Sequence, residues 1–598
     1  MIKELFELLT KEQRYTFYRL QALVVVMALF EVFSIASIAP FMALVADPNI
    51  INSNNLFAKA YKLSAMNDVK EFVLLSGSLV LLSLIIASLV SMFTTWRLSS
   101  FAMRTGTEIS DRLFKYYINQ NWLFHASGSS AQFTKQITTE SVRITNNILQ
   151  PFMLINSRLL LALFISFGVI LYSPGIALSG LFIFVGGYFI IFKIVKKRLM
   201  RNGAILSDIA AERFSIINEG LGGIRDVILL NRSRYFSERF SKTGNIQAKA
   251  QAINSTLSQA PRYFMELIAF GSMILLVLVL LEFGDNTLKN VLPLLAVYAL
   301  SGLKILPALQ QIYASISTIK ASTAAFDNVK RDLIAYNAIS KNETGKTSKC
   351  EIDINNSKNI YLKNVCFEYP SSCKRVLNNI NLKIPLNSTV GFVGESGSGK
   401  STIVDLIVGL IDSSAGQLMI DDVEINVSNK KSWQSNIGFV SQSIFLSEGT
   451  IAENIAFGEK ISEIDWGRIN KSIKLAHLNN LVESLPSGIN TKIGERGVQI
   501  SGGQRQRIGI ARALYTDAKV FVFDEATSAL DGITERIIMN AVNELKGKRT
   551  IIMIAHRLKT IKECDCIFIM DKGEVIDQGT YSELMKRNIL FKKMDKYS

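Results

Sequence analysis

Residues 389–401 read Thr-Val-Gly-Phe-Val-Gly-Glu-Ser-Gly-Ser-Gly-Lys-Ser, and apolar residues at helical spacing follow over Thr402–Leu410. The order strand, glycine-rich loop, helix predicts that backbone N–H groups close around phosphate oxygens at the positive end of the helix. In this arrangement Lys400 reaches the β- and γ-phosphates of a nucleotide, and Ser401 supplies a hydroxyl to Mg²⁺. The predicted nucleotide contacts of this loop are Gly394, Glu395, Ser396, Gly397, Ser398, Gly399, Lys400, Ser401 and Thr402.

Two further apolar strands end in chemically active side chains. Residues 519–523 (Lys-Val-Phe-Val-Phe) lead into Asp524 and Glu525, and residues 549–555 (Arg-Thr-Ile-Ile-Met-Ile-Ala) lead into His556. The carboxyl ends of parallel strands meet at one edge of an α/β sheet, where ligands bind. We therefore expect Asp524 beside the metal, Glu525 polarising an attacking water, and His556 in the same row.

Between these strands, Ile500-Ser-Gly-Gly-Gln504 opens another apparent helix. Its start has the composition of a second anion-binding helix N-terminus, more than 100 residues from the glycine loop. A nucleotide site formed by one chain alone does not need two such helix N-termini. This spacing suggests that Ser501, Gly502, Gly503 and Gln504 complete the nucleotide site of another copy of the chain.

With these motifs in order, residues 360–598 resemble the nucleotide-binding domain of an ATP-binding-cassette (ABC) transporter. Tyr369 matches the aromatic residue that stacks on adenine in this family. Gln442 matches the residue of the Q-loop, Asp531 lies in the segment that matches the D-loop, and His556 matches the residue of the H-loop. Residues 495–497 (Glu-Arg-Gly) resemble the exporter-type X-loop, and Ile500 stands where leucine is commoner in the signature motif.

The resemblance implies an α/β P-loop domain, with a RecA-like core and a helical subdomain, that hydrolyses ATP with Mg²⁺. It assigns Glu525, His556 and Gln442 to catalysis, and Ser401, Gln442 and Asp524 to the metal. It also implies two ATP molecules sandwiched between the cassettes of a homodimer.

The first half of the chain has a different composition. The whole sequence is 49% hydrophobic and 19% charged, and its formal net charge is +16. Residues 1–340 hold 32 Lys+Arg against 20 Asp+Glu, so most of the basic excess lies in the apolar half. Cytoplasmic loops of membrane proteins collect Lys and Arg, which explains the excess better than nucleic-acid binding does.

Spanning the hydrocarbon layer takes about 20 mostly apolar residues. Six stretches qualify, and predict an all-α six-helix transmembrane domain: 20–46, 72–95, 152–172, 176–195, 264–283 and 288–312. The basic stretches 96–150 and 193–262 place both long loops and both termini in the cytoplasm. These loops are helix-patterned, so we expect the membrane helices to continue into the cytosol and turn there. The resemblance to ABC transporters implies coupling helices at the loop tips, near 118–128 and 220–232.

The predicted domains are a transmembrane domain over 1–332, a linker over 333–358 and the cassette over 359–598. All five cysteines lie after residue 349 without zinc-ligand spacing, which fits a cassette in the reducing cytosol.

Four charged residues lie inside the apolar spans at similar predicted depth: Glu31, Arg158, Glu266 and Lys304. Intramembrane charges are expensive and mark either a pathway or a pairing. One reading is two internal salt bridges that hold helices together. The other is a basic lining for an anionic headgroup, in which Glu31 and Glu266 neutralise Arg158 and Lys304 until the headgroup arrives.

Residues 30–41 and the sequence Lys304-Ile-Leu-Pro307 resemble the bacterial flippases of lipid-linked oligosaccharides, in which a basic residue precedes the Leu-Pro pair. Residues 47–71 resemble the external helix of that group, with Leu56, Phe57, Ala60, Tyr61 and Leu63 on its apolar side.

The resemblance favours an ATP-driven flippase of the inner membrane that moves a polyprenyl-pyrophosphate glycan outward as a homodimer. A lipid A-core or phospholipid flippase and a multidrug exporter are the alternatives. An ATP-gated channel is disfavoured because no regulatory insert is present. Six spans exclude a soluble ABC ATPase of DNA repair or translation, and we expect no nucleic-acid partner.

Overall fold

The computed structural model describes the following residues: 2–46, 58–59, 61–62, 64, 68–172, 174–283, 288–343, 352, 354, 356–370, 374–494, 500–524, 532–555 and 557–597. The chain divides into two compact units between Thr344 and Gly345, apart from Asn121–Leu123, which group with the second unit. This division falls inside the predicted linker.

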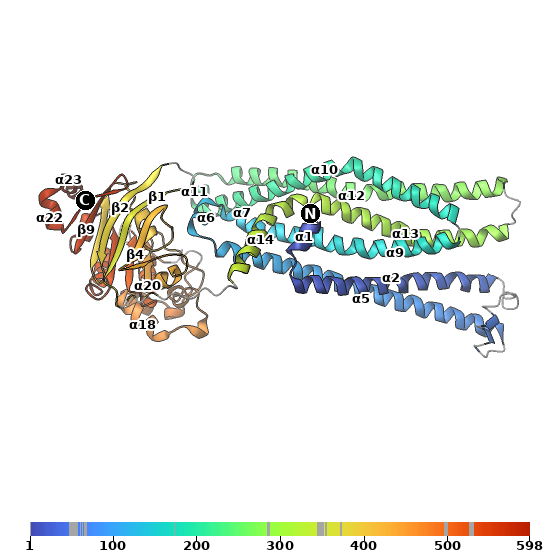
Figure 1. Ribbon diagram of the computed structural model, residues 1–598, viewed down its shortest axis with the longest axis horizontal. Helices are drawn as coiled ribbons and strands as arrows, with labels where there is room; N and C mark the ends of the chain where they lie inside the picture. The colour runs from blue at the N-terminus through green and yellow to red at the C-terminus, as the bar shows by residue number, and fades with distance from the viewer. Residues whose placement is uncertain are drawn as a thin grey trace. The chain divides into compact units, whose positions relative to one another are not determined.

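The first unit consists of long helices that run side by side (Figure 1). They are α2 (Lys11–Ala46), α5 (Val69–Ile118), α9 (Gln150–Tyr172), α10 (Pro174–Gly222), α12 (Ser233–Phe283) and α13 (Leu288–Ala321). Within the described residues, three helical stretches are long and apolar enough to cross a membrane, at Lys11–Met42, Val69–Ile118 and Ser130–Gly168. They contain most of the first predicted span, all of the second and most of the third. The other predicted spans lie in α10, α12 and α13, and most side chains over 272–301 lie outside the described residues.

The predicted cytosolic extensions are confirmed as helices. α5 has 50 residues, α10 has 49 and α12 has 51, more than twice the ~20 needed to span the hydrocarbon. Short helices stand at the two predicted turns, α6 (Trp122–Ser127) and α11 (Ile224–Leu229).

The structure differs from the sequence prediction at the start of the linker. Helix α14 (Thr323–Glu343) continues through residues that were predicted to be aperiodic. Its buried residues Phe326, Val329 and Leu333 recur at helical spacing, and packing of this apolar stripe stabilises the helix beyond residue 333. Of the predicted external helix, Ala58–Lys59 and Tyr61–Lys62 are helical, whereas residues 47–57 and 63 lie outside the described part of the chain.

Glycines allow close helix packing in the cytosolic extensions. A Cβ at Gly203 of α10 would overlap the carbonyl oxygen of Ala321 in α13, and a Cβ at Gly106 of α5 would overlap the side chain of Thr145. Both glycines therefore sit at positions where only a hydrogen atom fits.

The second unit contains two sheets (Figure 1). An antiparallel sheet has the order β2-β1-β4-β5, and a six-stranded sheet has the order β10-β9-β3-β8-β7-β6. The strands are β1 (Asn359–Glu368), β2 (Arg375–Pro385), β3 (Thr389–Gly394), β4 (Ala415–Ile420), β5 (Val423–Glu424), β6 (Ile437–Val440), β7 (Val520–Asp524), β8 (Thr550–Ile554), β9 (Cys566–Asp571) and β10 (Glu574–Gly579).

In the six-stranded sheet, β9, β3, β8, β7 and β6 are parallel, and β10 pairs antiparallel to β9. Alternate residues of β7 point into two separate cores, because successive side chains of a strand face opposite sides. Val520 and Val522 pack with residues of α15 (Lys400–Ile407), whereas Phe521 and Phe523 pack with residues of α20 (Gly502–Tyr515). Helices α15 and α20 thus cover opposite faces of this sheet.

Smaller helices complete the second unit. They are α16 (Lys430–Gln434), α17 (Ile451–Ile455), α18 (Trp466–Leu475), α19 (Asn479–Ser484), α21 (Gly532–Asn543), α22 (Tyr581–Arg587) and α23 (Ile589–Tyr597). Helix α20 packs against α17, α18 and β6, which forms the predicted helical subdomain beside the sheet.

The close approach of α10 to α13 gives a stability prediction. Gly203→Ala should destabilise the protein by about 1–3 kcal/mol, because the added methyl group must push backbone atoms apart. Gly186→Ala on the same helix is the matched control, since a Cβ there meets nothing within 4 Å. Thermal unfolding in detergent should show a melting temperature lowered by roughly 2–10 °C for Gly203→Ala alone. Equal melting temperatures of the two variants would contradict the close packing.

Candidate functional site: the nucleotide edge of the cassette

The loop between β3 and α15 has the conformation of a phosphate cradle. Gly397 and Gly399 have φ angles of 81° and 101°, in the left-handed region that glycine adopts without a steric penalty. A Cβ at Gly399 would lie 2.9 Å from the Cδ2 atom of Leu377, and one at Gly394 would overlap the carbonyl oxygen of Met570. The loop therefore packs against β2 and β9 and presents its backbone at the start of α15.

The lysine of the loop lies within the same cradle. Lys400 is buried, and its Nζ donates hydrogen bonds to the carbonyl oxygens of Gly394 at 2.9 Å and Glu395 at 2.8 Å. Ser401 is exposed at the next position of the helix. The ammonium group thus lies over the loop, where it would meet phosphate oxygens.

Tyr369 lies beside the first turn of α15. Its hydroxyl is 3.4 Å from the hydroxyl of Thr402, and its ring packs edge-on against Phe367 with the centroids 5.0 Å apart. The predicted adenine-stacking residue is therefore adjacent to the phosphate loop, although they are more than 20 residues apart in sequence.

The strand order brings the predicted motifs to one edge. The neighbouring strands β3, β8, β7 and β6 are parallel, so their carboxyl ends lie together. β3 ends in the glycine loop and β7 ends in Asp524. β6 ends at Val440, two residues before Gln442, which is exposed. The sheet topology therefore gathers Lys400, Asp524 and Gln442 at one edge.

A second carboxylate, which the sequence reading missed, lies near Asp524. Asp405 is on α15, and burial raises the pKa of its carboxyl group to about 6, with the charge of Asp524 adding to the shift. A polar residue between the apolar Val404 and Leu406 was the available sequence signal. A bound divalent cation would relieve the repulsion between the two acids.

The residues present fit Mg²⁺. No cluster of three His, Cys, Asp or Glu side chains suited to a metal occurs among the described residues. Mg²⁺ is commonly held by one or two carboxylates together with the phosphates of the substrate. Asp524, the Ser401 hydroxyl and the Gln442 amide supply oxygen ligands of this kind. Mg²⁺ bound there would neutralise charge that develops on the transferred phosphoryl group.

The signature residues form a capped helix start. Ser501 precedes α20, and its Oγ accepts a hydrogen bond from the backbone N–H of Gln504 at 3.3 Å. The side-chain oxygen of Gln504 in turn accepts from the backbone N–H of Ser501 at 2.8 Å. This capping box orders the turn that contains Gly502 and Gly503, whose N–H groups have no acceptor within the helix.

Some predicted site residues lie outside the described part of the chain. These are Glu525, Asp531, His556 and the loop over residues 495–497.

The structure shows the partners of the four predicted membrane charges within one chain. Glu31 accepts a hydrogen bond from Ser91 of α5 at 2.6 Å, and Glu266 pairs with Arg262, one turn before it in α12, at 2.6 Å. Among the described residues, Arg158 and Lys304 have no ion pair or hydrogen bond. Within one chain, neither acid therefore forms an ion pair with Arg158 or Lys304 among the described residues, and the neutralisation of these cations in a homodimer stays a prediction.

A P-loop cassette with its motifs along one sheet edge, joined to a bundle of membrane-length helices, defines an ATP-driven membrane transporter. The chain belongs to the ABC transporter family. Residues 377–528 match the family model described as "ABC transporter", and residues 21–302 match "ABC transporter transmembrane region". ATP hydrolysis is coupled to transport in this family.

Similar proteins support this assignment. The "Heterocyst differentiation ATP-binding protein HepA" of Nostoc sp. is 29% identical over 518 residues, 84% of this chain and 82% of the relative. The "ATP-dependent lipid A-core flippase" of Cupriavidus pinatubonensis is 31% identical over 402 residues, 66% of this chain and 65% of that protein. The flippase of the same name from Photobacterium profundum is 43% identical over 231 residues, 38% of this chain and 39% of that protein.

A solved structure shares the complete fold. A bacterial Atm1-family ABC exporter with ATP bound superposes with a TM-score of 0.78 at 20% identity. The match covers 97% of this chain and 98% of that chain. The match shows that this chain has the fold of that exporter, with a helical membrane region followed by a nucleotide-binding domain.

The position of Tyr369 gives a prediction for nucleotide affinity. Tyr369→Ala should weaken ATP binding by about 10- to 100-fold, because an aromatic ring stacked on a base contributes about 1–3 kcal/mol. Tyr369→Phe keeps the ring and should bind ATP within about threefold of the wild type, since the contact with Thr402 is long. Titration with a fluorescent ATP analogue measures both. An equal loss in the two variants would assign the effect to the hydroxyl group instead.

Proposed function

We propose that this exporter flips a lipid with a phosphorylated headgroup outward across the inner membrane, and that the lipid is a polyprenyl-pyrophosphate glycan. The observation that carries the proposal is the pair of cations Arg158 and Lys304. Both lie in predicted membrane spans, and neither has a counter-ion among the described residues. An unpaired cation inside hydrocarbon is costly, so its retention favours an anionic ligand.

The two cations belong to helices that pack together. Arg158 lies one turn before Ala162 in α9, and Lys304 lies one turn before Ala308 in α13. Ala162 and Ala308 share a buried cluster with Leu161 and Ile165. Arg158 is half-buried and Lys304 is exposed within a single chain. In a homodimer each cation occurs twice, which provides four positive charges for a pyrophosphate.

Two lipid classes suit these charges. The sequence Lys304-Ile-Leu-Pro307 favours the lipid-linked glycan, by resemblance to flippases of that substrate. Several similar proteins are named lipid A-core flippases, and this supports the lipid A core as the alternative substrate. Both are anionic amphiphiles, so the same cations serve either lipid.

The substrate prediction is tested by charge removal. In proteoliposomes, Arg158→Gln and Lys304→Gln should each reduce lipid-stimulated ATPase activity at least about tenfold, because loss of a desolvated charge contact costs several kcal/mol. Basal ATPase activity should stay unchanged. Arg158→Lys and Lys320→Gln are the controls: the first keeps the charge, and the second removes a charge of α13 beyond its predicted span.

The panel for this measurement contains a polyprenyl-pyrophosphate glycan, lipid A core and an uncharged amphipathic drug. Stimulation by the glycan alone supports the specific proposal, and stimulation by lipid A core alone supports the alternative. Full stimulation of both glutamine variants, or stimulation by the uncharged drug alone, would overturn the anionic-headgroup model.

We also propose that ATP is hydrolysed at sites shared by two identical chains, with Mg²⁺ held by Ser401, Gln442 and Asp524 and with Glu525 as general base. The argument rests on the cassette, where α15 and α20 cover opposite faces of one sheet. The phosphate loop begins α15 and the signature turn begins α20. A second chain therefore supplies the signature residues Ser501 and Gly503 to the nucleotide held by Lys400.

Cysteine crosslinking tests the shared site. Ser396→Cys and Ser501→Cys combined in one chain should yield a covalent dimer on oxidation with ATP bound, because the two positions meet across the chain boundary. Non-reducing electrophoresis separates dimer from monomer, and each single-cysteine variant controls for the native thiols. A crosslink formed within one chain would contradict the shared site.

A further inference from the structure

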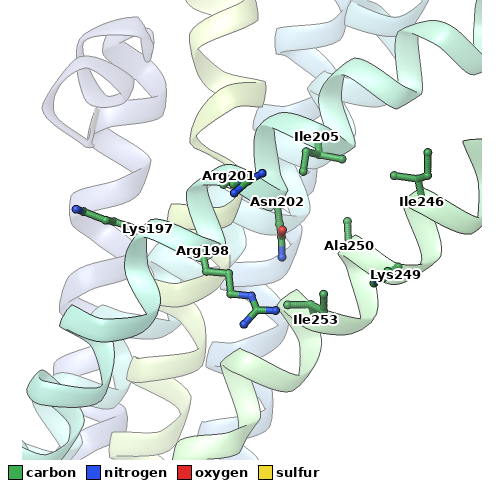
Figure 2. Close-up of a pocket in the computed structure, with 9 residues that line it drawn as sticks. All are labelled: Lys197, Arg198, Arg201, Asn202, Ile205, Ile246, Lys249, Ala250 and Ile253. Carbon is green, nitrogen blue, oxygen red and sulfur yellow. The ribbon is translucent and has the colours of Figure 1, made fainter.

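Arg512 of the cassette helix α20 is a half-buried cation that forms no ion pair among the described residues. It differs from exposed cations such as those around the groove between α10 and α12, which Figure 2 shows: Lys197, Arg198, Arg201 and Lys249. Water solvates an exposed cation, whereas a cation withdrawn from water is costly unless other groups hydrogen-bond it. The groups that replace water around Arg512 therefore indicate what this residue does.

The partners of Arg512 belong to residues 444–457 (the Q-loop segment), which follow Gln442 of the Q-loop. The Nε of Arg512 donates a hydrogen bond to the carbonyl oxygen of Asn454 at 2.8 Å, and its Nη2 donates to that of Phe445 at 3.1 Å. The guanidinium group also lies over the ring of Phe457, 4.6 Å from its centroid. One planar side chain of α20 therefore fixes three points of the Q-loop segment.

The Q-loop segment is held together internally by Asn454, which is fully buried. The Oδ1 of Asn454 accepts a hydrogen bond from the backbone N–H of Ser447 at 2.9 Å. Its Nδ2 donates to the carbonyl oxygens of Ser447 at 3.1 Å and Thr450 at 3.0 Å. Opening the segment would leave this buried amide without partners, which is costly. The segment therefore moves as one unit.

A second contact joins the Q-loop segment to α20 close to Gln442. Ile444 is buried, and a Cβ at Gly509 of α20 would overlap its Cδ1 atom. Arg512 lies eleven residues along α20 from Ser501, which corresponds to about 16 Å. The contacts at Ile444 and Arg512 hold the segment to the helix whose other end forms the signature turn. A displacement at Gln442 can therefore be transmitted to the signature turn.

We propose that Arg512 is a positioning residue that connects the two nucleotide sites of a dimer. Gln442 serves the nucleotide held by Lys400 of its own chain, whereas the signature turn of that chain serves the nucleotide held by the other chain. Because Arg512 holds the Q-loop segment to α20, nucleotide bound at one site sets the position of the signature turn at the other site. This inference rests on the proposed sharing of each site between two chains.

Crosslinking rates of the full-length protein in proteoliposomes test this connection. In the Ser396→Cys/Ser501→Cys chain, Arg512→Gln should lower the crosslinking rate in ATP about tenfold, because the loss of two charge-assisted hydrogen bonds releases α20 from the Q-loop segment. The rate in ADP and the affinity for a fluorescent ATP analogue should stay within about threefold, since Arg512 is not part of the nucleotide edge. General destabilisation of the cassette would lower the rates in ATP and in ADP together.

Two further variants in the same background complete the experiment. Arg507→Gln is the matched control, because Arg507 also lies on α20 and donates to a carbonyl oxygen at 2.9 Å, but to that of His477, outside the Q-loop segment. Its rate in ATP should stay within about threefold of the parent chain. Arg512→Lys keeps the charge and serves if Arg512→Gln does not fold. One nitrogen cannot replace both Nε and Nη2, so its rate in ATP should still fall at least about threefold.

The connection is overturned if both Arg512 variants crosslink in ATP at the rate of the parent chain. Equal losses in Arg507→Gln and Arg512→Gln, or equal losses in ATP and ADP, would also overturn it, because they assign the effect to general stability of the cassette. Absence of an ATP-dependent crosslink in the parent chain would overturn the shared site and this inference together. A normal crosslink in the parent chain confines any failure to the role of Arg512.

Discussion

One fully buried carboxylate, that of Glu140, connects the cytosolic extensions of the membrane helices. It pairs with Lys135 at 3.3 Å and Arg143 at 3.0 Å, and it accepts a hydrogen bond from Ser207 of α10. Asn328 of α14 donates to the same Ser207 hydroxyl at 2.9 Å. Leaving this buried carboxylate without its partners would destabilise the protein by several kcal/mol, so the elements that supply the partners must stay together. A displacement of α6 or α11 can therefore be transmitted to the membrane, because the long helices move as whole units.

The backbone near Glu140 is also unusual. The helix that leads into α9 contains two π-helical stretches, η1 (Lys135–Glu140) and η2 (Thr145–Leu149). Single π-turns inside α-helices rotate the following residues and occur often at functional positions. Here they lie on either side of Arg143, and η2 begins at Thr145, which packs against Gly106 of α5. Tyr117 of α5 reinforces the junction by donating to Asp332 of α14 at 2.5 Å.

The sequence was sufficient for features that local chemistry determines. The glycine loop at 394–401, the acid that ends β7 and the start of α20 lie where the sequence predicted these elements, because each depends on residues adjacent in the chain. The helical extensions were also predictable, since their apolar stripes continue beyond the hydrocarbon length. By contrast, the partners of the charges in the predicted membrane spans were not predictable. Glu266 was expected to pair across helices, yet Arg262 lies four residues before it, just outside the predicted span.

Asp405 and the π-helical stretches escaped the sequence reading because their importance depends on tertiary neighbours. Nothing in a single sequence indicates that the carboxyl group of Asp405 lies near that of Asp524, or that the helix before α9 contains π-helical stretches.

The arrangement of membrane charges has a consequence for energy coupling. Among the described residues Glu31 and Glu266 have partners and Arg158 and Lys304 have none, so these two cations would give the proposed pathway a positive potential. Such a potential draws a phosphorylated headgroup inward but equally opposes its release.

Release of the lipid requires a second conformation of the transporter that binds the headgroup less well. The free-energy difference between the two conformations must come from outside the lipid site. In the proposed shared site, nucleotide binding draws two chains together and would supply that difference. If the helices α9 and α13 of the two chains then separate or admit water, the cations are hydrated and the attraction for phosphate falls with the rise in local dielectric constant.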